Sequence, residues 1–216
     1  MTDNPPPKKK SIGTWLWNPF TLLAGAPALT AGVIILLITG ALAAPTRTHL
    51  DGVLDTHIGF DAPIWVFLSE GIINWLCLAI VLWIAGLLLK GPGKFRALDL
   101  FGTQALARWP FLLTTLVCYL PGIREVTTAL NKLAVTGKIG QMPEVESAHM
   151  IAFSIATIGM ILVTIWFVAL AWKSFRISCD VRGGKAIAAF VIGILLAEAL
   201  SKFAIMKGLA SLIPES

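Results

Sequence analysis

Long runs of apolar residues separated by short polar segments dominate this chain. Four of the runs cover about 22–44, 63–89, 149–172 and 186–206. Each is long enough to cross the hydrocarbon layer of a bilayer as a helix, which takes about 20 residues. The segments between them contain Gly, Pro and charged residues, which end helices. The pattern therefore predicts membrane-spanning helices rather than the amphipathic elements of a soluble domain.

A shorter apolar run, residues 109–123, is predicted to be a fifth span. Arg108 and Arg124 bound it, which leaves about 15 residues where a span usually has ~17–25. We expect a short helix whose arginines extend to the interfaces, and the alternative is a re-entrant segment. Residues 95–108 carry apolar side chains at helical spacing, so we expect an amphipathic helix along the inner membrane surface.

The N-terminal segment differs from the rest of the chain. Residues 1–11, MTDNPPPKKKS, are rich in Pro and charge and predict a disordered basic tail. The lysines precede Trp15 and Trp17, a pattern typical of a segment that binds anionic lipid at the inner surface. Residues 12–207 then form one five-helix transmembrane domain, and 208–216 form a short tail.

A secretory signal is the alternative interpretation of the N-terminal segment. Lys8 to Lys10 would be its basic region, and Ala41-Leu42-Ala43 would be its cleavage site. We disfavour it because the apolar run is too long and begins too far after the lysines.

The distribution of Lys and Arg predicts the orientation. In the five-span arrangement, eleven of these residues fall on the side of the N-terminus and six on the other side. Basic residues concentrate on the cytoplasmic side of membrane proteins. We therefore predict an all-α polytopic transmembrane bundle of about five spans, with its N-terminus cytoplasmic and its C-terminus outside. With four spans the basic segment 173–185 would lie outside, so the orientation argues that residues 109–123 cross.

Composition narrows the functional classes. Charged residues make up 13% of the chain and mean hydropathy is +0.81, whereas soluble domains have about 25% charged residues. The net charge of +5 comes from scattered residues that form no basic face, so we exclude nucleic acid as a partner. The sequence has no HExxH, GxSxG, P-loop or Rossmann pattern. We therefore expect a non-enzymatic protein with no catalytic residue, cofactor or metal site.

Polar residues inside the predicted spans form the candidate site: Glu70, Asn74, Glu198 and Lys202. Glu70 lies seven residues into the second span, about 10 Å deep, and Asn74 lies one turn further on the same helix face. Lys202 and Glu198 lie in the outer part of the fifth span. All four are thus predicted in the outer half of the membrane, where charges are costly and usually face the bundle interior.

Three interpretations of these residues stay open. In a structural role, Glu198 and Lys202 pair along one helix, while Glu70 binds Lys202 or a hydroxyl such as Ser154 or Thr157. In a functional role, the cluster is an outward-open pocket for an ion, a proton or a lipid headgroup. The third interpretation is that a span boundary is misplaced and one residue lies at the interface. Separately, small residues predict close helix approach at Gly32, Gly40, Gly86, Gly159 and Gly193.

Three sequence features resemble the Yip family, the Rab/Ypt-interacting five-span membrane proteins, and especially its prokaryotic members. The first is the sequence WLWNPF at 15–20, before the first span. The second is the glycine-rich connection, amphipathic stretch and short span from Gly91 to Pro121. The third is WKSFR at 172–176 followed by GGKAI at 183–187. The resemblance covers about 12–207 and implies five spans, a cytoplasmic N-terminus and a role in membrane organisation or trafficking.

Two functions follow as hypotheses. The first is a non-enzymatic scaffold that organises membrane partners, which would be the lipid bilayer, other membrane proteins or further copies of the chain. The alternative is a small transporter or permease-like subunit that uses the outer-half polar cluster and oligomerises, because no inverted repeat is evident. A membrane-embedded enzyme ranks lowest. A bacterial inner membrane is the expected location.

Overall fold

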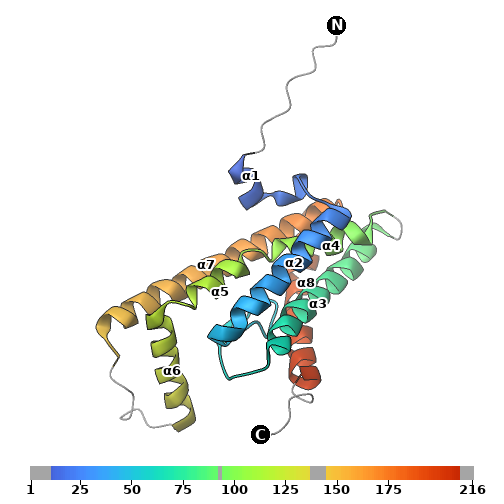
Figure 1. Cartoon of the computed structure of the whole chain (residues 1–216). Coiled ribbons are helices and arrows are strands. Elements are labelled where there is room, and N and C mark those ends of the chain that lie inside the picture. The colour runs from blue at the N-terminus through green and yellow to red at the C-terminus, as the bar shows by residue number, and fades with distance from the viewer. Residues whose placement is uncertain (1–10, 92–93, 137–144, 210–216) are drawn as a thin grey trace.

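The computed structural model describes residues 11–91, 94–136 and 145–209, most of which are helical (Figure 1). The α-helices are α1 (Ile12–Trp17), α2 (Gly25–Ala43), α3 (Ile64–Lys90), α4 (Ala97–Ala107), α5 (Phe111–Val117), α6 (Pro121–Thr136), α7 (Ser147–Ser178) and α8 (Gly184–Ala204). Shorter helical turns are η1 (Pro19–Thr21), η2 (Ala44–Thr46) and η4 (Ile205–Leu209), a π-helical turn that extends α8. Two-residue strands β1 (Thr48–His49) and β2 (His57–Ile58) pair antiparallel, with Thr48 opposite Ile58 and His49 opposite His57. The expected disordered tail lies almost entirely outside the described residues.

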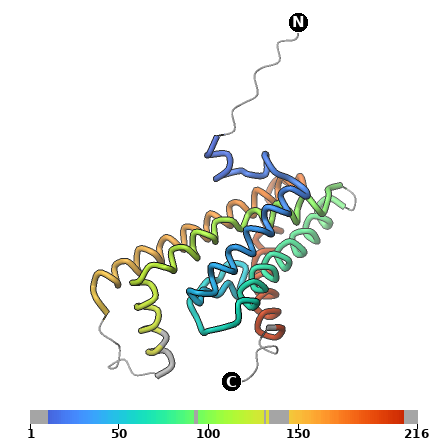
Figure 2. Tube along the Cα trace, in the orientation of Figure 1, coloured from blue at the N-terminus to red at the C-terminus, as the bar shows by residue number. Residues whose placement is uncertain are grey.

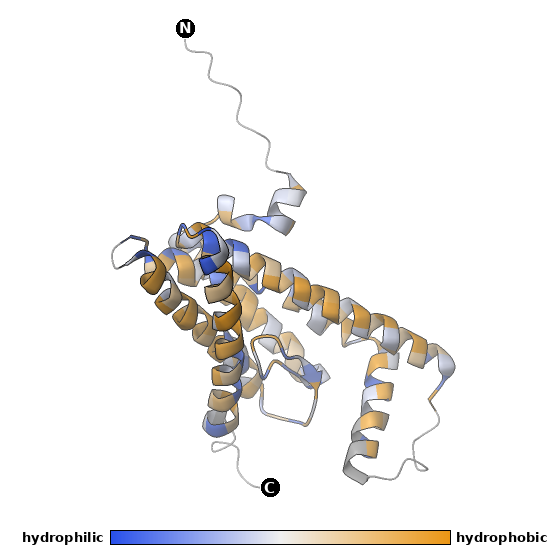
Figure 3. Ribbon diagram, turned by 180° about the vertical axis from the view of Figure 1, so that it is seen from behind, coloured by the Kyte–Doolittle hydropathy of each residue, from blue (hydrophilic) through white to orange (hydrophobic). Residues whose placement is uncertain are grey.

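Four helical segments of the described chain are long and apolar enough to cross a membrane: Gly25–Thr46, Ile64–Lys90, Ser147–Ser178 and Gly184–Gly208. A fifth candidate is the segment Ala97–Val117, which continues through a bend of 84° into Pro121–Leu130. Hydrophobic residues run along the long helices, and hydrophilic residues lie mainly near the helix ends (Figure 3). The protein is thus a multi-pass, all-α integral membrane protein, as the sequence predicts.

The connections between the helices lie at two opposite ends of the bundle (Figures 1 and 2). At one end, Lys173 on α7 donates a hydrogen bond of 2.7 Å to the Trp17 carbonyl. There too, Lys90 lies 3.4 Å from the Asp180 carboxylate, which links α3 to the α7–α8 turn. At the other end, the Tyr119 hydroxyl donates to the carbonyl of Leu42 at 2.9 Å. Below, the end near Trp17 is called the inner end and the end near Tyr119 the outer end, following the predicted orientation.

The expectation that residues 95–108 lie along the membrane surface is wrong. They form α4, which is packed between α2, α3 and α7 with Leu100 and Ala105 fully buried. Trp109 and Pro110 separate α4 from α5, so the helical segment begins at Ala97 rather than at residue 109. Arg108 seemed to mark the end of a span, but it is buried. The prediction starts the span after Arg108 because arginine usually lies at a membrane interface. The sequence does not show that other side chains bury this arginine.

Glycine allows the close contact between α2 and α4. A Cβ atom added to Gly32 would lie 2.5 Å from the Ala105 Cβ and the Leu106 backbone nitrogen, much closer than van der Waals contact permits. Three more of the predicted glycines have neighbours within 3.1 Å of such a Cβ: Gly40, Gly86 and Gly193. Gly159 has none within 4 Å, so the prediction of close approach is wrong there.

Gly32→Ala tests this packing. The added methyl group meets backbone atoms that cannot rotate away, so we expect the free energy of unfolding to fall by about 1–3 kcal/mol, as for other overpacked cores. Thermal unfolding in detergent measures the change. Gly159→Ala is the matched control, since its methyl group enters open space and alanine favours helix. Equal stability of Gly32→Ala and the native chain would contradict the close α2–α4 contact.

Candidate functional site

The connection between η2 and α3, residues 47–63, is here named the outer loop. It folds back against the helices instead of staying at the surface (Figure 2). Leu50 and Val53 are 3% and 0% exposed and belong to one buried cluster with Phe111, Phe167 and Ala197. A loop that enters an apolar core must find partners for its backbone polar groups, because no water reaches them there.

Glu70 and Asn74 supply two of these partners from consecutive turns of α3. The Leu50 N–H donates to Glu70 Oε2 at 2.9 Å, and Asn74 Nδ2 donates to the Leu50 carbonyl. Both side chains are buried, with exposures of 2% and 0%. The i, i+4 spacing that placed them on one face thus brings both polar groups of Leu50 into hydrogen bonds.

His49 binds the other oxygen of Glu70. Its Nδ1 lies 2.7 Å from Glu70 Oε1, and its Nε2 lies 3.0 Å from the Phe60 carbonyl. Carboxylate and carbonyl oxygens only accept, so both ring nitrogens donate and the ring is an imidazolium. Burial alone lowers the pKa of His49, but the hydrogen bonds to Glu70 and Phe60 outweigh it and raise the pKa above 6.5. The charge of Glu70 is therefore paired inside the protein.

Glu198 and Lys202 bind the next part of the outer loop. The Leu54 N–H donates to Glu198 Oε2 at 2.8 Å. Lys202 Nζ lies 3.2 Å from Glu198 Oε1 and 2.7 Å from Asp55 Oδ2. A Cβ on Gly52 would lie 2.3 Å from Glu198 Oε1, so the loop approaches this carboxylate as closely as only glycine allows.

Arg108 completes the set of contacts from the α4–α5 junction. Its side chain is 1% exposed, and its guanidinium lies 5.2 Å and 5.0 Å from the ring centroids of Phe111 and Phe167. Nη2 contacts the Val53 carbonyl at 3.5 Å. The Val53 carbonyl and the Leu54 N–H belong to one peptide group, which therefore lies between the positive charge of Arg108 and the negative charge of Glu198.

Asp51 and His57 form a more exposed pair on the same loop, 3.3 Å apart. Their mutual hydrogen bond is the main reason that the pKa of Asp51 is lowered and that of His57 raised. Ligand atoms of Asp51, Asp55 and His57 lie within 4.8 Å of one another, a spacing that could hold a metal ion. Lys202 and His57 already neutralise the two aspartates, so we assign no metal site.

The four candidate residues of the sequence lie around one loop, as two pairs. Glu198 and Lys202 make the expected i, i+4 ion pair. The expected partner of Glu70 is wrong, because Glu70 binds His49 and Leu50, while Ser154 and Thr157 donate to carbonyls of their own helix. The two pairs are connected through the backbone of the outer loop.

Sequence reasoning missed two buried residues of this site, His49 and Arg108. His49 lies in a polar segment that predicts exposure to solvent. Arg108 stands next to a short apolar run, which predicts a position at the membrane interface. The β1–β2 pairing also stacks the rings of His49 and His57, with centroids 5.7 Å apart. The change from polar to apolar residues at Pro63 predicts where α3 begins, but it does not indicate that the preceding loop packs into the bundle.

Comparison with protein-family models, with curated proteins and with solved structures gave no match to this chain. The fold and the site therefore define its class by themselves. It is a multi-pass α-helical membrane protein whose outer loop re-enters the bundle and is held there by buried charged and amide side chains.

Glu70→Gln tests whether Glu70 holds the outer loop. Glutamine keeps the size but replaces one acceptor by a donor and removes the partner charge of His49. We expect the free energy for withdrawal of the outer loop from the bundle to fall by about 1–3 kcal/mol, as for a buried group left without its hydrogen bond. The reporter is Val53→Cys in a background without Cys77, Cys118 and Cys179, labelled by an impermeant maleimide.

In that assay the cysteine at 53 should be protected in the native background and labelled in Glu70→Gln. Phe60→Cys is the control, because Phe60 is exposed and should label equally in both backgrounds. Protection of position 53 in Glu70→Gln would show that the loop does not depend on this carboxylate.

The histidine pairs predict a pH dependence. His49 and His57 have raised pKa values, so their contribution to stability is full below pH 6.5 and is lost as pH rises through those raised values. Asp51 has a lowered pKa, so its contribution is lost only as pH falls below 3.8 toward that lowered value. The melting temperature in detergent should therefore fall as pH rises above 6.5.

His49→Gln should reduce this slope of melting temperature against pH. His149→Gln is the matched control and should keep it, because His149 contacts Glu125 and Glu146 rather than the outer loop. Identical slopes in the native chain and in His49→Gln would rule out His49 as the group that titrates.

Proposed function

We propose that this chain is a non-enzymatic membrane-organising protein, a scaffold of the kind that its resemblance to the Yip family implies. Its N-terminus is cytoplasmic in this proposal, and its partners are the bilayer, anionic lipid at the inner surface, and other membrane proteins or copies of itself. A bacterial inner membrane is the proposed location.

The observation that carries this proposal is the occupation of the polar cluster by the chain's own groups. Glu70 accepts from His49 and Leu50, and Glu198 accepts from Leu54 and pairs with Lys202. A carrier needs such carboxylates to exchange a solvent-derived ion or proton. Here both carboxylates hold a loop whose residues Leu50 and Val53 pack into the core, which favours a structural role.

The inner end supports the same proposal. Helix α1 lies against α7, where Trp166 Nε1 donates to the Leu16 carbonyl at 3.1 Å and Lys173 lies 5.9 Å from the Trp17 ring centroid. Trp15 and Trp17 are 45% and 57% exposed. Exposed tryptophans on a short helix at the end of a bundle suit the headgroup region of the inner surface.

A transporter subunit is the second candidate. The buried Arg108, which contacts the Val53 carbonyl close to Glu198, favours it. A buried arginine with one weak hydrogen bond is costly in a membrane and commonly marks a substrate pathway. If the outer loop withdrew, Glu70, Glu198 and Arg108 would face an outward-open cavity. The two candidates differ in what Glu198 does.

Glu198→Gln separates the candidates. The protein and its variant are reconstituted in liposomes, and fluxes of H⁺, Na⁺ and K⁺ are recorded together with thermal unfolding in detergent. A scaffold should give no flux above empty liposomes, and the substitution should lower the free energy of unfolding by about 1–3 kcal/mol, because the Leu54 N–H and Lys202 lose a charged partner.

Glu146→Gln is the matched control, since the same chemical change at this exposed residue should alter neither reading. A flux in the native protein that disappears in Glu198→Gln at unchanged melting temperature would overturn the scaffold proposal and establish the transporter.

A further inference from the structure

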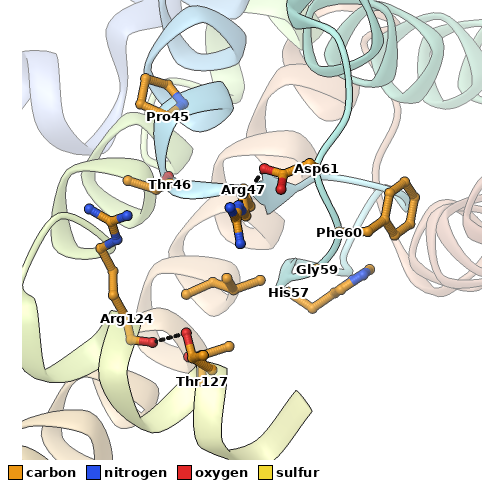
Figure 4. A pocket seen from close by; sticks show the side chains of 11 residues that line it. Pro45, Thr46, Arg47, His57, Gly59, Phe60, Asp61, Arg124 and Thr127 are labelled. Carbon is orange, nitrogen blue, oxygen red and sulfur yellow. Dashed lines mark hydrogen bonds and ion pairs between the residues drawn. The ribbon is translucent and has the colours of Figure 1, made fainter. Parts of the chain in front are cut away.

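A cleft of about 640 Å³ opens at the outer end, between the outer loop and α6 (Figure 4). One wall consists of η2, Arg47 and the outer-loop residues 57–61, which include β2. The other wall consists of the first two turns of α6. The polar cluster described above lies elsewhere, because Glu70, Glu198 and Lys202 do not line this cleft.

Two arginines from separate elements reach into the cleft. Arg47 follows η2. Its Nε lies 2.5 Å from Asp61 Oδ1, and its side chain is 51% exposed, which leaves it accessible to a further partner. Arg124 comes from α6 and extends toward η2 (Figure 4). Within the described part of the chain, no carboxylate lies within ion-pair distance of the Arg124 guanidinium.

The cleft therefore has an excess of positive charge. Its lining includes Arg47 and Arg124 but only one carboxylate, Asp61, while His57 is paired with Asp51. Arg124 also lies in the first turn of the 16-residue helix α6. The N-terminal end of a helix carries partial positive charge, so an arginine there is unfavourable unless an anion is close. The excess of arginine charge and the N-terminal end of α6 both favour an anionic ligand in this cleft.

The shape and location of these groups specify the ligand. A guanidinium presents two parallel N–H donors that match the oxygens of a phosphate. The cleft lies at the outer end of the spans, where the neighbouring Tyr119 and Leu120 are 42% and 50% exposed. Exposed aromatic and aliphatic side chains at a span end lie at the depth where headgroups meet acyl chains.

We propose that this cleft binds a phosphate group through Arg47 and Arg124, carried by an anionic phospholipid headgroup of the outer leaflet or by free phosphate. The cleft is thus a second anion-binding region, separate from the basic segments of the inner end, and it would attach the outer loop and α6 to the same ligand. This inference does not depend on the scaffold proposal, since a transporter could carry the same site.

Native mass spectrometry of the full chain in detergent tests it, with phosphatidylglycerol, phosphatidylcholine and inorganic phosphate as separate probes. The native chain should bind phosphatidylglycerol, and Arg124→Gln should weaken that binding about tenfold, the effect of losing one charge-assisted hydrogen bond. Arg47→Gln should weaken it similarly. Lys207→Gln is the matched control, because Lys207 is an exposed basic residue at the outer end that does not line the cleft.

The outcomes separate the two sources of phosphate. Binding of phosphatidylglycerol that depends on Arg124 and resists millimolar phosphate identifies a lipid site. Binding of inorganic phosphate that depends on Arg124 and displaces the lipid identifies a free-phosphate site. Affinity that is unchanged in Arg124→Gln, or reduced equally in Lys207→Gln, overturns the proposal. Among the residues that the structure describes, Arg124 has no ion-pair partner to lose, so its variant should fold even if Arg47→Gln, which loses Asp61, does not.

Discussion

The structure depends on hydrogen bonds between buried side chains of the spans and the backbone of the outer loop. Leu50 and Val53 gain from burial in the core, but their peptide groups would be unsatisfied there and each would cost several kcal/mol. Glu70, Asn74, Glu198 and Arg108 satisfy the peptide groups that enter deepest. Removing these side chains leaves the apolar residues of the loop without a way to stay inside.

The same contacts explain why charged residues are tolerated within the spans. An isolated charge in an apolar interior is strongly unfavourable, and pairing with a good set of hydrogen bonds offsets this. Glu70 is opposite the imidazolium of His49, and Glu198 is opposite Lys202. Arg108 is stabilised by two aromatic rings and one carbonyl. Glu70, Glu198 and Arg108 come from three different elements, so they connect α3, α8 and the α4–α5 junction through one loop.

The outer cleft is a consequence of the fold-back. Because the loop between η2 and α3 occupies the bundle, its flanking segments stay at the outer end and face α6 across the cleft. The 84° bend before α6 places Arg124 on the opposite wall. The cleft thus lies at the end of the bundle opposite to the exposed Trp15 and Trp17.

The sequence by itself determined the long helices, the membrane class and the i, i+4 pairs. These follow from local rules, since the length of an apolar run and the spacing on one helix need no knowledge of neighbours. Tertiary structure alone decided that the outer loop re-enters, that His49 pairs with Glu70, that α4 is buried and that Arg108 is covered. Each of these depends on contacts between residues far apart in the chain, and a polar loop or a lone arginine looks the same in sequence whether water or protein surrounds it.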